Sequence, residues 1–318
     1  MDEVENSRTD DTHPPALGGG ADHGVVVTTP DTPLIPVVLA SPHSGRAYPD
    51  DFFSISRLDP ISLRKSEDCF VDEIFTPAAA LGAPMIKALF PRAYVDVNRE
   101  PFELDPDMFA DPLPDYVNTG SPRVAAGLGT VARIVSHGKS IYRRKLRFSE
   151  ALSRIDRHYR PYHATLSDLI HDTKDRFGHC ILIDCHSMPS SNPMPARGSA
   201  RGRIDFVLGD AYGQACSPAI IDLAEACLQA RGFNVVRNFP YAGGYTTRHY
   251  GQPGAGIHAL QIEINRDLYM DEAALTRKSY LRTLSEHMAE LVARIATVDP
   301  KSADPKSAFS VAATAQHD

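Results

Sequence analysis

Short apolar runs alternate along most of the chain with longer segments of helical character. Several runs are rich in Val, Ile and Leu and end in Gly, Pro or polar residues, which is typical of buried strands. We predict strands at 37–40, 85–88, 94–98, 180–184, 205–208, 234–237 and 259–265. We predict helices at about 66–80, 139–175, 217–231 and 271–297, the second broken or kinked at Pro161. This alternation predicts an α/β fold with a mixed, largely parallel central sheet.

The two ends of the chain lack this alternation. Residues 1–32 and 299–318 are polar, so we predict a disordered N-terminal extension and a disordered C-terminal tail around a single domain at 33–298. The five cysteines are odd in number and form no CxxC pair, which favours a reducing cytoplasm. The net charge of -7 argues against a nucleic-acid partner. No apolar run suits a signal peptide or a membrane span.

Two predicted strands, 37–40 and 180–184, each run into a short polar segment that contains a histidine, His43 in the first case and His186 in the second. In open α/β sheets, ligands bind at the carboxyl ends of the strands. A metal site assembled from distant parts of the chain is therefore one interpretation. The alternative is that each histidine caps its strand or bonds a loop carbonyl.

An acidic third ligand is available on the predicted helix 66–80. Asp68 and Asp72 lie one turn apart and can face the same way. Asp68 could complete the metal site if the helix lies beside His43, and its neighbour Glu67 is an alternative that spacing does not exclude. Both aspartates could instead be solvated or favoured by the helix dipole.

Glu263 lies inside an apolar run whose alternation places Ile262 and Ile264 on one face of a strand and Glu263 on the other. A buried acid is costly unless it is paired or functional. Glu263 is therefore a candidate general base beside a metal site. A structural ion pair with Arg266 or Arg248 is the alternative.

Two arginines, Arg92 and Arg99, bracket the predicted strand 94–98. A guanidinium can bind a carboxylate through two hydrogen bonds or stabilise a developing oxyanion, although surface arginines are also common. Weaker candidates for substrate contacts lie in loops or at helix edges, namely Arg133, Tyr142, Arg143 and Arg248. The long aperiodic segment 101–130 is predicted to be a functional loop near the site.

Together these motifs resemble the N-formylglutamate amidohydrolase family. They occur in order between residues 36 and 272 and so cover nearly all of the predicted domain. The matching strings are Ser41-Pro42-His43-Ser44-Gly45, Asp68-x-x-Val71-Asp72, Asp96-Val97-Asn98-Arg99, Gly138-x-x-Ile141-Tyr142, Pro161-Tyr162-His163, Asp184-Cys185-His186-Ser187-Met188-Pro189, Tyr241-Ala242-Gly243-Gly244-Tyr245 and Gln261-Ile262-Glu263-Ile264-Asn265-Arg266.

The resemblance implies a three-layer α/β/α fold similar to the zinc carboxypeptidases and aspartoacylases. It implies a Zn²⁺ site, or a site for another divalent metal, with the ligands His43, Asp68 and His186. It also implies that Glu263 is the general base, that Arg92 polarises the scissile carbonyl, and that Asn98 and Arg99 bind the substrate carboxylate. The chain departs from the His-x-x-Glu motif of the carboxypeptidases at Arg46, so the acidic ligand must come from later in the chain.

The implied reaction is hydrolysis of N-formyl-L-glutamate, or a related small anionic N-acyl amino acid, to formate and the free amino acid by a zinc-activated water. The implied pathway is histidine degradation. Alternatives are an amidase or peptidase acting on another N-acyl amino acid, a peptide or a cell-wall amide, and a catalytically silent binding protein of the same fold. A thiol hydrolase that pairs Cys185 with His186 is disfavoured, because adjacent strand residues point to opposite faces.

Overall fold

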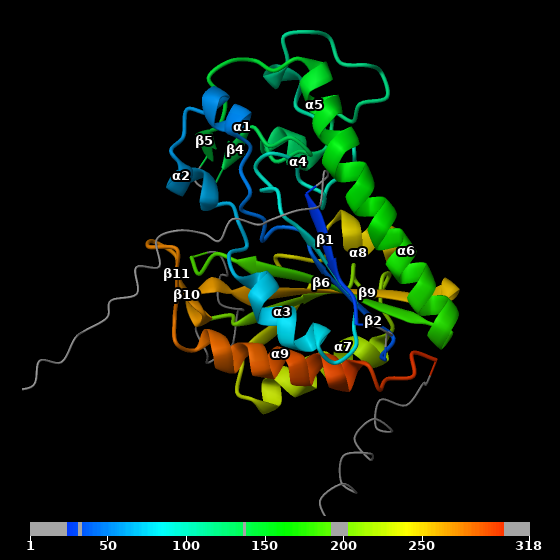
Figure 1. The fold of residues 1–318 in the computed structure, drawn as a ribbon. Helices are drawn as coiled ribbons and strands as arrows, with labels where there is room; N and C mark the ends of the chain where they lie inside the picture. The colour runs from blue at the N-terminus through cyan, green and yellow to red at the C-terminus, as the bar shows by residue number, and fades with distance from the viewer. Residues whose placement is uncertain (1–23, 31–33, 136–137, 192–202, 302–318) are drawn as a thin grey trace, which may run out of the picture.

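The computed structural model describes residues 24–30, 34–135, 138–191 and 203–301 (Figure 1). Its central sheet has the strand order β1-β3-β2-β6-β9-β7-β8. The four strands β3, β2, β6 and β9 are parallel. β1 pairs antiparallel with β3, and β7 pairs antiparallel with β9 and parallel with β8. The predicted mixed, largely parallel sheet is confirmed. The strand bounds are Val25–Thr28 (β1), Val37–Ser41 (β2), Met85–Ala88 (β3), Cys180–Met188 (β6), Phe206–Gly209 (β7), Val235–Arg237 (β8) and Ile257–Asn265 (β9).

Helices cover both faces of this sheet, which gives three layers (Figure 1). One face packs against α3 (Val71–Ala79), α7 (Pro218–Ala230) and α9 (Leu281–Ile295). The other packs against α6 (Arg160–Phe177) and α8 (Tyr245–Tyr250). None of the helices in the described ranges is both long enough and apolar enough to span a membrane. Smaller elements are α1 (Asp50–Ile55), α2 (Pro60–Arg64), α4 (Pro122–Ala125), α5 (Phe148–Arg154), β4 (Ile134–Val135), β5 (Lys139–Ser140), β10 (Met270–Asp271) and β11 (Thr276–Arg277).

Toward the carboxyl ends of β6 and β9, the alternation separates an apolar face from a polar one. Ile183 and Cys185 belong to the apolar core beneath α3, α7 and α9. Asp184 and His186 therefore point to the opposite face, toward α6 and α8. In the register of the sheet, His186 lies directly opposite Glu263 on the parallel neighbour β9. The carboxyl ends of two central strands thus bring polar groups together.

Several predicted elements differ from the observed ones. The predicted strand 94–98 is a turn segment, because the Tyr94 amide bonds the Pro91 carbonyl and the Asn98 amide bonds the Asp96 carboxylate instead of a sheet neighbour. The predicted N-terminal extension is wrong at β1, which pairs with β3 inside the sheet. Residues 1–23 and 302–318 lie outside the described residues, and the other domain limits stay a prediction.

Predicted helix starts also shift. α3 begins at Val71 after Phe70, whose φ of 65° interrupts the predicted helix 66–80, so Asp68 precedes the helix. The predicted helix 139–175 begins at α5 and passes through a π-helical turn at Ile155–Tyr159 before α6. This turn lies next to Pro161, where a backbone donor is missing. The predicted helix 271–297 begins only at α9, after the hairpin β10–β11.

Candidate metal centre and active site

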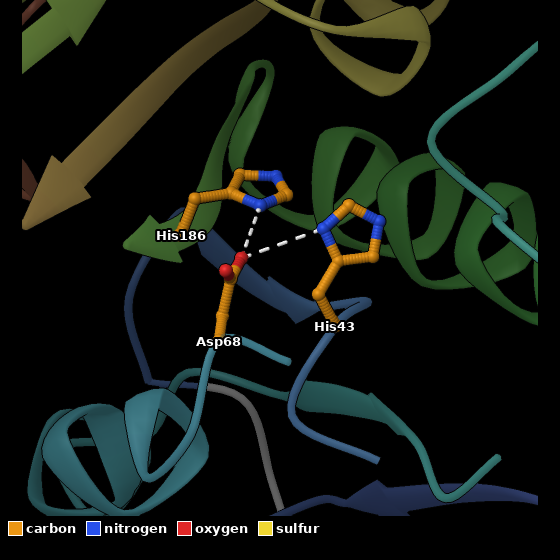
Figure 2. A group of neighbouring side chains, drawn as sticks. All are labelled: His43, Asp68 and His186. Carbon is orange, nitrogen blue, oxygen red and sulfur yellow. Dashed lines mark hydrogen bonds and ion pairs between the residues drawn. The ribbon is translucent and has the colours of Figure 1, made fainter. Parts of the chain in front are cut away.

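Three buried side chains from distant parts of the chain meet at the ends of β2 and β6. Asp68 Oδ2 lies 3.1 Å from His186 Nδ1 and 3.4 Å from His43 Nδ1 (Figure 2). One donor atom from each residue lies within 4.8 Å of the other two. His43 follows β2, Asp68 precedes α3 and His186 lies on β6. The three form a compact set of two imidazoles and one carboxylate.

Hydrogen bonds on the far side of each imidazole orient its Nδ1 toward this centre. His43 Nε2 lies 2.7 Å from Asp96 Oδ1, and His186 Nε2 lies 2.8 Å from Asp184 Oδ1. Because a carboxylate only accepts, each Nε2 carries a proton. His43 Nδ1 is buried without a hydrogen-bond partner. Metal-binding histidines show this arrangement, in which the outer nitrogen donates to a carboxylate, so the residues fit a divalent metal.

Arginines stabilise the negative charge around the centre. Arg266 Nη2 lies 2.9 Å from Asp68 Oδ1, and Arg92 Nη2 lies 2.8 Å from Asp96 Oδ2. Burial alone would raise the pKa of Asp68, but the contacts with His186 and His43 and the charge of Arg266 hold it well below its usual range. Asp68 is therefore a carboxylate at neutral pH.

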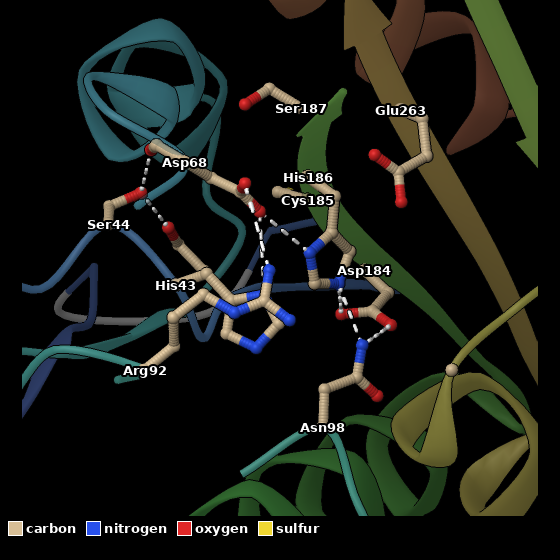
Figure 3. A network of polar contacts seen from close by, with 12 residues as sticks. His43, Ser44, Asp68, Arg92, Asn98, Asp184, Cys185, His186, Ser187 and Glu263 are labelled. Atoms are coloured by element: carbon tan, nitrogen blue, oxygen red, sulfur yellow. Dashed lines mark hydrogen bonds and ion pairs between the residues drawn. The ribbon is translucent and has the colours of Figure 1, made fainter. Parts of the chain in front are cut away.

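The Asp184 carboxylate is fixed by neutral donors instead. Thr247 Oγ1 donates to Asp184 Oδ2 at 3.2 Å. Asn98 Nδ2 lies 3.4 Å from the same oxygen and 3.0 Å from His186 Nε2 (Figure 3). Asn98 Oδ1 accepts the Thr246 amide at 2.8 Å, which fixes the orientation of the Asn98 side chain. Gly244 is required here, since a Cβ at this position would lie 2.3 Å from Asn98 Oδ1.

Glu263 lies beside His186 on the polar face (Figure 3). Its Oε1 accepts a hydrogen bond from Gln261 Nε2 at 2.9 Å, and Gln261 Oε1 accepts the Gly244 amide at 2.7 Å. Burial raises the pKa of Glu263 to about 7, although the charges of His186 and Arg92 oppose this shift. Among the described residues, Gln261 and not Arg266 or Arg248 supplies its hydrogen bond.

A cavity of about 560 Å³ opens above these groups. The predicted site residues His43, Asp68, Arg92, Asn98, Arg99, His186, Arg248 and Glu263 all line it. The segment 101–130, predicted as a functional loop near the site, contributes Arg123 and Leu128, and the residues that follow it contribute Ala132, Ile134 and Val135. Most of the polar segment 190–203, which follows β6, lies outside the described residues.

Three predicted substrate contacts are not part of this cavity. Arg133, Tyr142 and Arg143 line a separate hollow. Arg133 Nε lies 2.6 Å from Asp105 Oδ2, and the Tyr142 hydroxyl accepts a hydrogen bond from Arg154 at 2.8 Å. The sequence pattern could not show that their side chains bind partners within the fold.

The structure also distinguishes Asp68 from its neighbour Glu67. The buried Glu67 carboxylate accepts hydrogen bonds from the Tyr48 hydroxyl at 2.7 Å and from Arg64 Nε at 3.1 Å. It belongs to a different cluster, and Asp68 alone of the two lies with the histidines. Asp72, although one turn from Asp68 in sequence, does not line the cavity either.

Asn98 and Arg99, which were predicted to bind the substrate carboxylate, have hydrogen-bond partners inside the protein. Arg99 donates from Nε to the Leu128 carbonyl at 2.9 Å and from Nη1 to the Asn98 carbonyl at 2.7 Å. Asn98 directs its Nδ2 toward Asp184 and His186 and accepts the Thr246 amide with its Oδ1. The sequence offered Arg266 only as an ion-pair partner of Glu263, and it assigned no role to Asp96 or Arg123. The first two occur in the motif strings, whereas Arg123 has no sequence signal.

Cys185 lies on the opposite face of β6 from His186, as predicted. It is fully buried in the apolar core, and burial raises the pKa of its thiol well above the usual range. A thiolate nucleophile beside His186 is therefore not available.

Comparisons with known proteins agree with these motifs. The family model "FGase: N-formylglutamate amidohydrolase" matches residues 35–270. N-formylglutamate deformylase of Pseudomonas putida is 30% identical over 241 residues, covering 75% of this chain and 83% of that protein. The enzyme of the same name from Pseudomonas aeruginosa is 30% identical over 244 residues, covering 76% and 84%.

Solved structures show the same similarity. The crystal structure of N-formylglutamate amidohydrolase from Ralstonia eutropha JMP134 has a TM-score of 0.80 and 36% sequence identity, covering 86% of this chain and 97% of that one. A gene product of Agrobacterium tumefaciens has a TM-score of 0.63 and 18% identity, covering 86% and 94%, and supports the fold alone.

Proposed function

Because the chain belongs to the N-formylglutamate amidohydrolase family, we propose that it hydrolyses the formamide bond of N-formyl-L-glutamate to formate and glutamate. The observation that carries this proposal is the buried cluster of His43, Asp68 and His186, with Glu263 beside it. The cluster lies at the base of a cavity that is lined by several arginine side chains. A formamide is a stable bond, so its hydrolysis needs an activated water and a proton donor for the leaving nitrogen.

His43, Asp68 and His186 would hold the metal, and two imidazoles with one carboxylate are a donor set typical of catalytic zinc sites. A bound Zn²⁺ ion supplies a Lewis acid for the formyl oxygen and lowers the pKa of a water molecule. Asp96 and Asp184 keep the two imidazoles in the tautomer that presents Nδ1. Arg266 keeps the Asp68 carboxylate in place through its bond to Oδ1.

Glu263 is positioned to carry the proton. Its carboxylate lies on the cavity side of β9, opposite His186, and Gln261 bonds only one of its two oxygens. The free oxygen can take a proton from the attacking water and return it to the leaving nitrogen. Its raised pKa makes both transfers accessible near neutral pH.

Arg92 is placed to stabilise negative charge on the formyl oxygen. Its Nη2 bonds Asp96, while its Nη1 lies 4.0 Å from Asp68 Oδ1 and the side chain is 22% exposed, at the cavity. A guanidinium with one nitrogen anchored and another facing the cavity is a preorganised donor.

Two further arginines are suited to the carboxylates of the substrate. Arg123 on α4 and Arg248 on α8 are exposed and line the cavity from different elements. Burial, opposed by Asp96 and assisted by the charge of Arg123, lowers the pKa of Arg99 to about 10. An anion beside Arg123 would relieve this repulsion. A substrate with two carboxylates therefore matches the charge of the cavity.

Steady-state kinetics on N-formyl, N-acetyl and longer N-acyl amino acids test the proposal. We expect N-formyl-L-glutamate to be turned over best, with activity lost in excess chelator and regained with Zn²⁺. Full activity in metal-free protein would exclude the metal-dependent mechanism. Preference for an acetylated substrate, a peptide or a cell-wall amide would instead support the alternative amidase function, and binding without turnover would support a silent binding protein.

Variants of the cavity arginines test the substrate contacts. We expect Arg123→Gln and Arg248→Gln each to raise KM for N-formyl-L-glutamate about 10-fold or more, the effect of one lost charge-assisted hydrogen bond. Arg282→Gln, on the exposed surface of α9, is the matched control and should leave KM unchanged. An unchanged KM in either cavity variant removes that arginine from the substrate site.

A further inference from the structure

His163, near the start of α6, comes from a motif string that the proposed mechanism does not use. Its imidazole is largely buried and lies against four tyrosine rings, with ring centroids 4.3 Å away for Tyr159, 5.4 Å for Tyr245, 5.5 Å for Tyr162 and 5.9 Å for Tyr250. His163 does not line the metal-site cavity. Its role must therefore be exerted through other residues.

Both ring nitrogens of His163 are hydrogen-bonded to segments that support the metal centre. Nε2 lies 2.8 Å from the Val97 carbonyl, and Nδ1 lies 2.9 Å from the Tyr250 hydroxyl. A carbonyl only accepts, so Nε2 donates and Nδ1 can only accept. The one proton of the Tyr250 hydroxyl is shared between His163 Nδ1 and the His163 backbone carbonyl, which lies 3.1 Å from the hydroxyl oxygen. Burial lowers the pKa of His163 to about 4, so the imidazole is neutral at neutral pH and keeps this tautomer. The ring therefore links α6, the loop at Val97 and the end of α8.

Tyr159 adds a second bond to the same loop. Its hydroxyl donates to the Arg99 carbonyl at 2.7 Å. Tyr159 is the last residue of the π-helical turn, an irregularity that is frequent at functional sites. His163 on α6 and Tyr159 in the turn before it thus form hydrogen bonds with the carbonyls of Val97 and Arg99, the two residues that flank Asn98.

His163 thus links two segments, the loop that contains Asn98 and the helix α8. Each segment supplies one side-chain hydrogen bond to Asp184. Asn98 Nδ2 approaches Asp184 from the loop, and Thr247 Oγ1 donates to it from α8, which ends at Tyr250. Asp184 in turn orients the His186 imidazole. The other imidazole, His43, depends on Asp96, which arginines hold directly.

We propose that His163, with Tyr159 and Tyr250, is a positioning residue that sets the Asp184–His186 pair through the Asn98 loop and α8. The proposal rests on the metal centre described above and not on the identity of the substrate. Hydrogen-bond partners of metal ligands typically change metal affinity about 10–100-fold when they are lost. His163 acts one step further from the metal, so we expect the lower end of this range.

The test compares two substitutions at His163 in the full chain. His163→Phe keeps an aromatic ring among the tyrosines and removes both hydrogen bonds. We expect it to weaken Zn²⁺ binding, measured by competition with a chromophoric chelator, by about 10-fold. We also expect an altered visible absorption spectrum of the Co²⁺-loaded protein, and a fall in kcat that exceeds the change in KM. His163→Gln keeps a donor within reach of the Val97 carbonyl and should restore most of the affinity.

His258→Phe is a matched control. His258 is also buried, burial lowers its pKa to about 4, and its Nδ1 accepts the Ser217 amide at 3.2 Å. It lies at the start of β9, at the far end of the strand from Glu263. We expect this variant to lose thermal stability to a similar extent while its Zn²⁺ affinity and Co²⁺ spectrum stay unchanged.

Unchanged Zn²⁺ affinity and Co²⁺ spectrum in folded His163→Phe would overturn the proposal and leave His163 a packing role. If that variant does not fold, Tyr159→Phe and Tyr250→Phe each remove a single hydroxyl, and wild-type Zn²⁺ affinity in both would also overturn it. Because metal affinity does not require turnover, a protein that binds Zn²⁺ but does not deformylate would refute the proposed function alone.

Discussion

The two faces of β6 and β9 carry opposite chemistry on the same backbone. One face presents Ile183, Cys185 and Ile262 to an apolar core formed with α3, α7 and α9. The other carries His186 and Glu263, which line the cavity, and Asp184, which bonds His186. All the residues of both strands are buried, so the faces differ in the kind of neighbour and not in exposure.

This contrast separates stability from chemistry along each strand. The apolar face contributes burial free energy, about 25 cal/mol per Å² of apolar surface removed from water. The polar face instead keeps several charges out of water, which is costly even when they are paired. We therefore expect substitutions on the polar face to change metal binding and turnover, and substitutions on the apolar face to change folding stability.

The largest effect is expected from Glu263→Gln on the polar face. The amide keeps the shape of the side chain and cannot accept the proton, so kcat should fall by about 10²–10⁴-fold, the usual contribution of a general base. Zn²⁺ content, measured by atomic absorption, should remain that of the wild type. A rate within a few-fold of the wild type would remove Glu263 from the mechanism.

The pH profile gives a second view of Glu263. Burial raises the pKa of its carboxyl to about 7. Only the deprotonated form can act as a base, so kcat/KM should fall as the pH decreases through this pKa. A cation bound nearby favours the charged carboxylate and would move the acid limb below pH 7. The limb should be absent from the residual activity of Glu263→Gln.

The division between the faces could be predicted from the sequence, because strand alternation has a fixed period of two. That period placed Glu263 opposite Ile262 and Cys185 opposite His186, and the structure confirms both assignments. The strand-end positions of His43 and His186 likewise placed them at one edge of a parallel sheet. Such predictions succeed because they depend only on local geometry.

Contacts made by turns and loops could not be predicted in this way. The Asp96 carboxylate reaches His43 because residues 94–98 form turns where a strand was predicted. Arg133 and Tyr142 occur in suitable loops, yet they pair with Asp105 and Arg154 away from the cavity. These outcomes depend on how distant segments pack, which no local pattern encodes.

A smaller effect on the same face is expected from Asp184→Asn. The amide cannot fully replace the carboxylate that accepts the His186 Nε2 proton, so we expect Zn²⁺ affinity to fall by about 10–100-fold. Competition with a chelator measures this loss, and the melting temperature of the metal-free protein should change little by comparison. If Asp184→Asn binds Zn²⁺ as the wild type does, the orientation of His186 does not depend on this carboxylate.

On the apolar face, Ile262→Ala should show the reverse pattern. Ile262 is fully buried, and its truncation leaves a cavity that costs about 2–5 kcal/mol of unfolding free energy. Chemical denaturation measures this loss. Its neighbours on β9 keep their register, so Zn²⁺ affinity and kcat should stay near those of the wild type. A large loss of metal affinity would show that packing on the apolar face also determines the geometry of the metal site.

The smallest effect is expected from Cys185→Ala, which tests the apolar face directly beside a proposed metal ligand. The Sγ atom makes one weak contact, 3.4 Å from the Ile183 carbonyl, and the thiol points into the apolar core. Its removal should cost about 1 kcal/mol of stability and leave kcat unchanged, since the burial that raises the pKa of this thiol also keeps it from acting as a nucleophile. A large fall in kcat at normal Zn²⁺ content would restore the thiol hydrolase mechanism. Wild-type turnover would show that only the face of β6 that carries His186 takes part in the reaction, and that Cys185 contributes only to packing in the core.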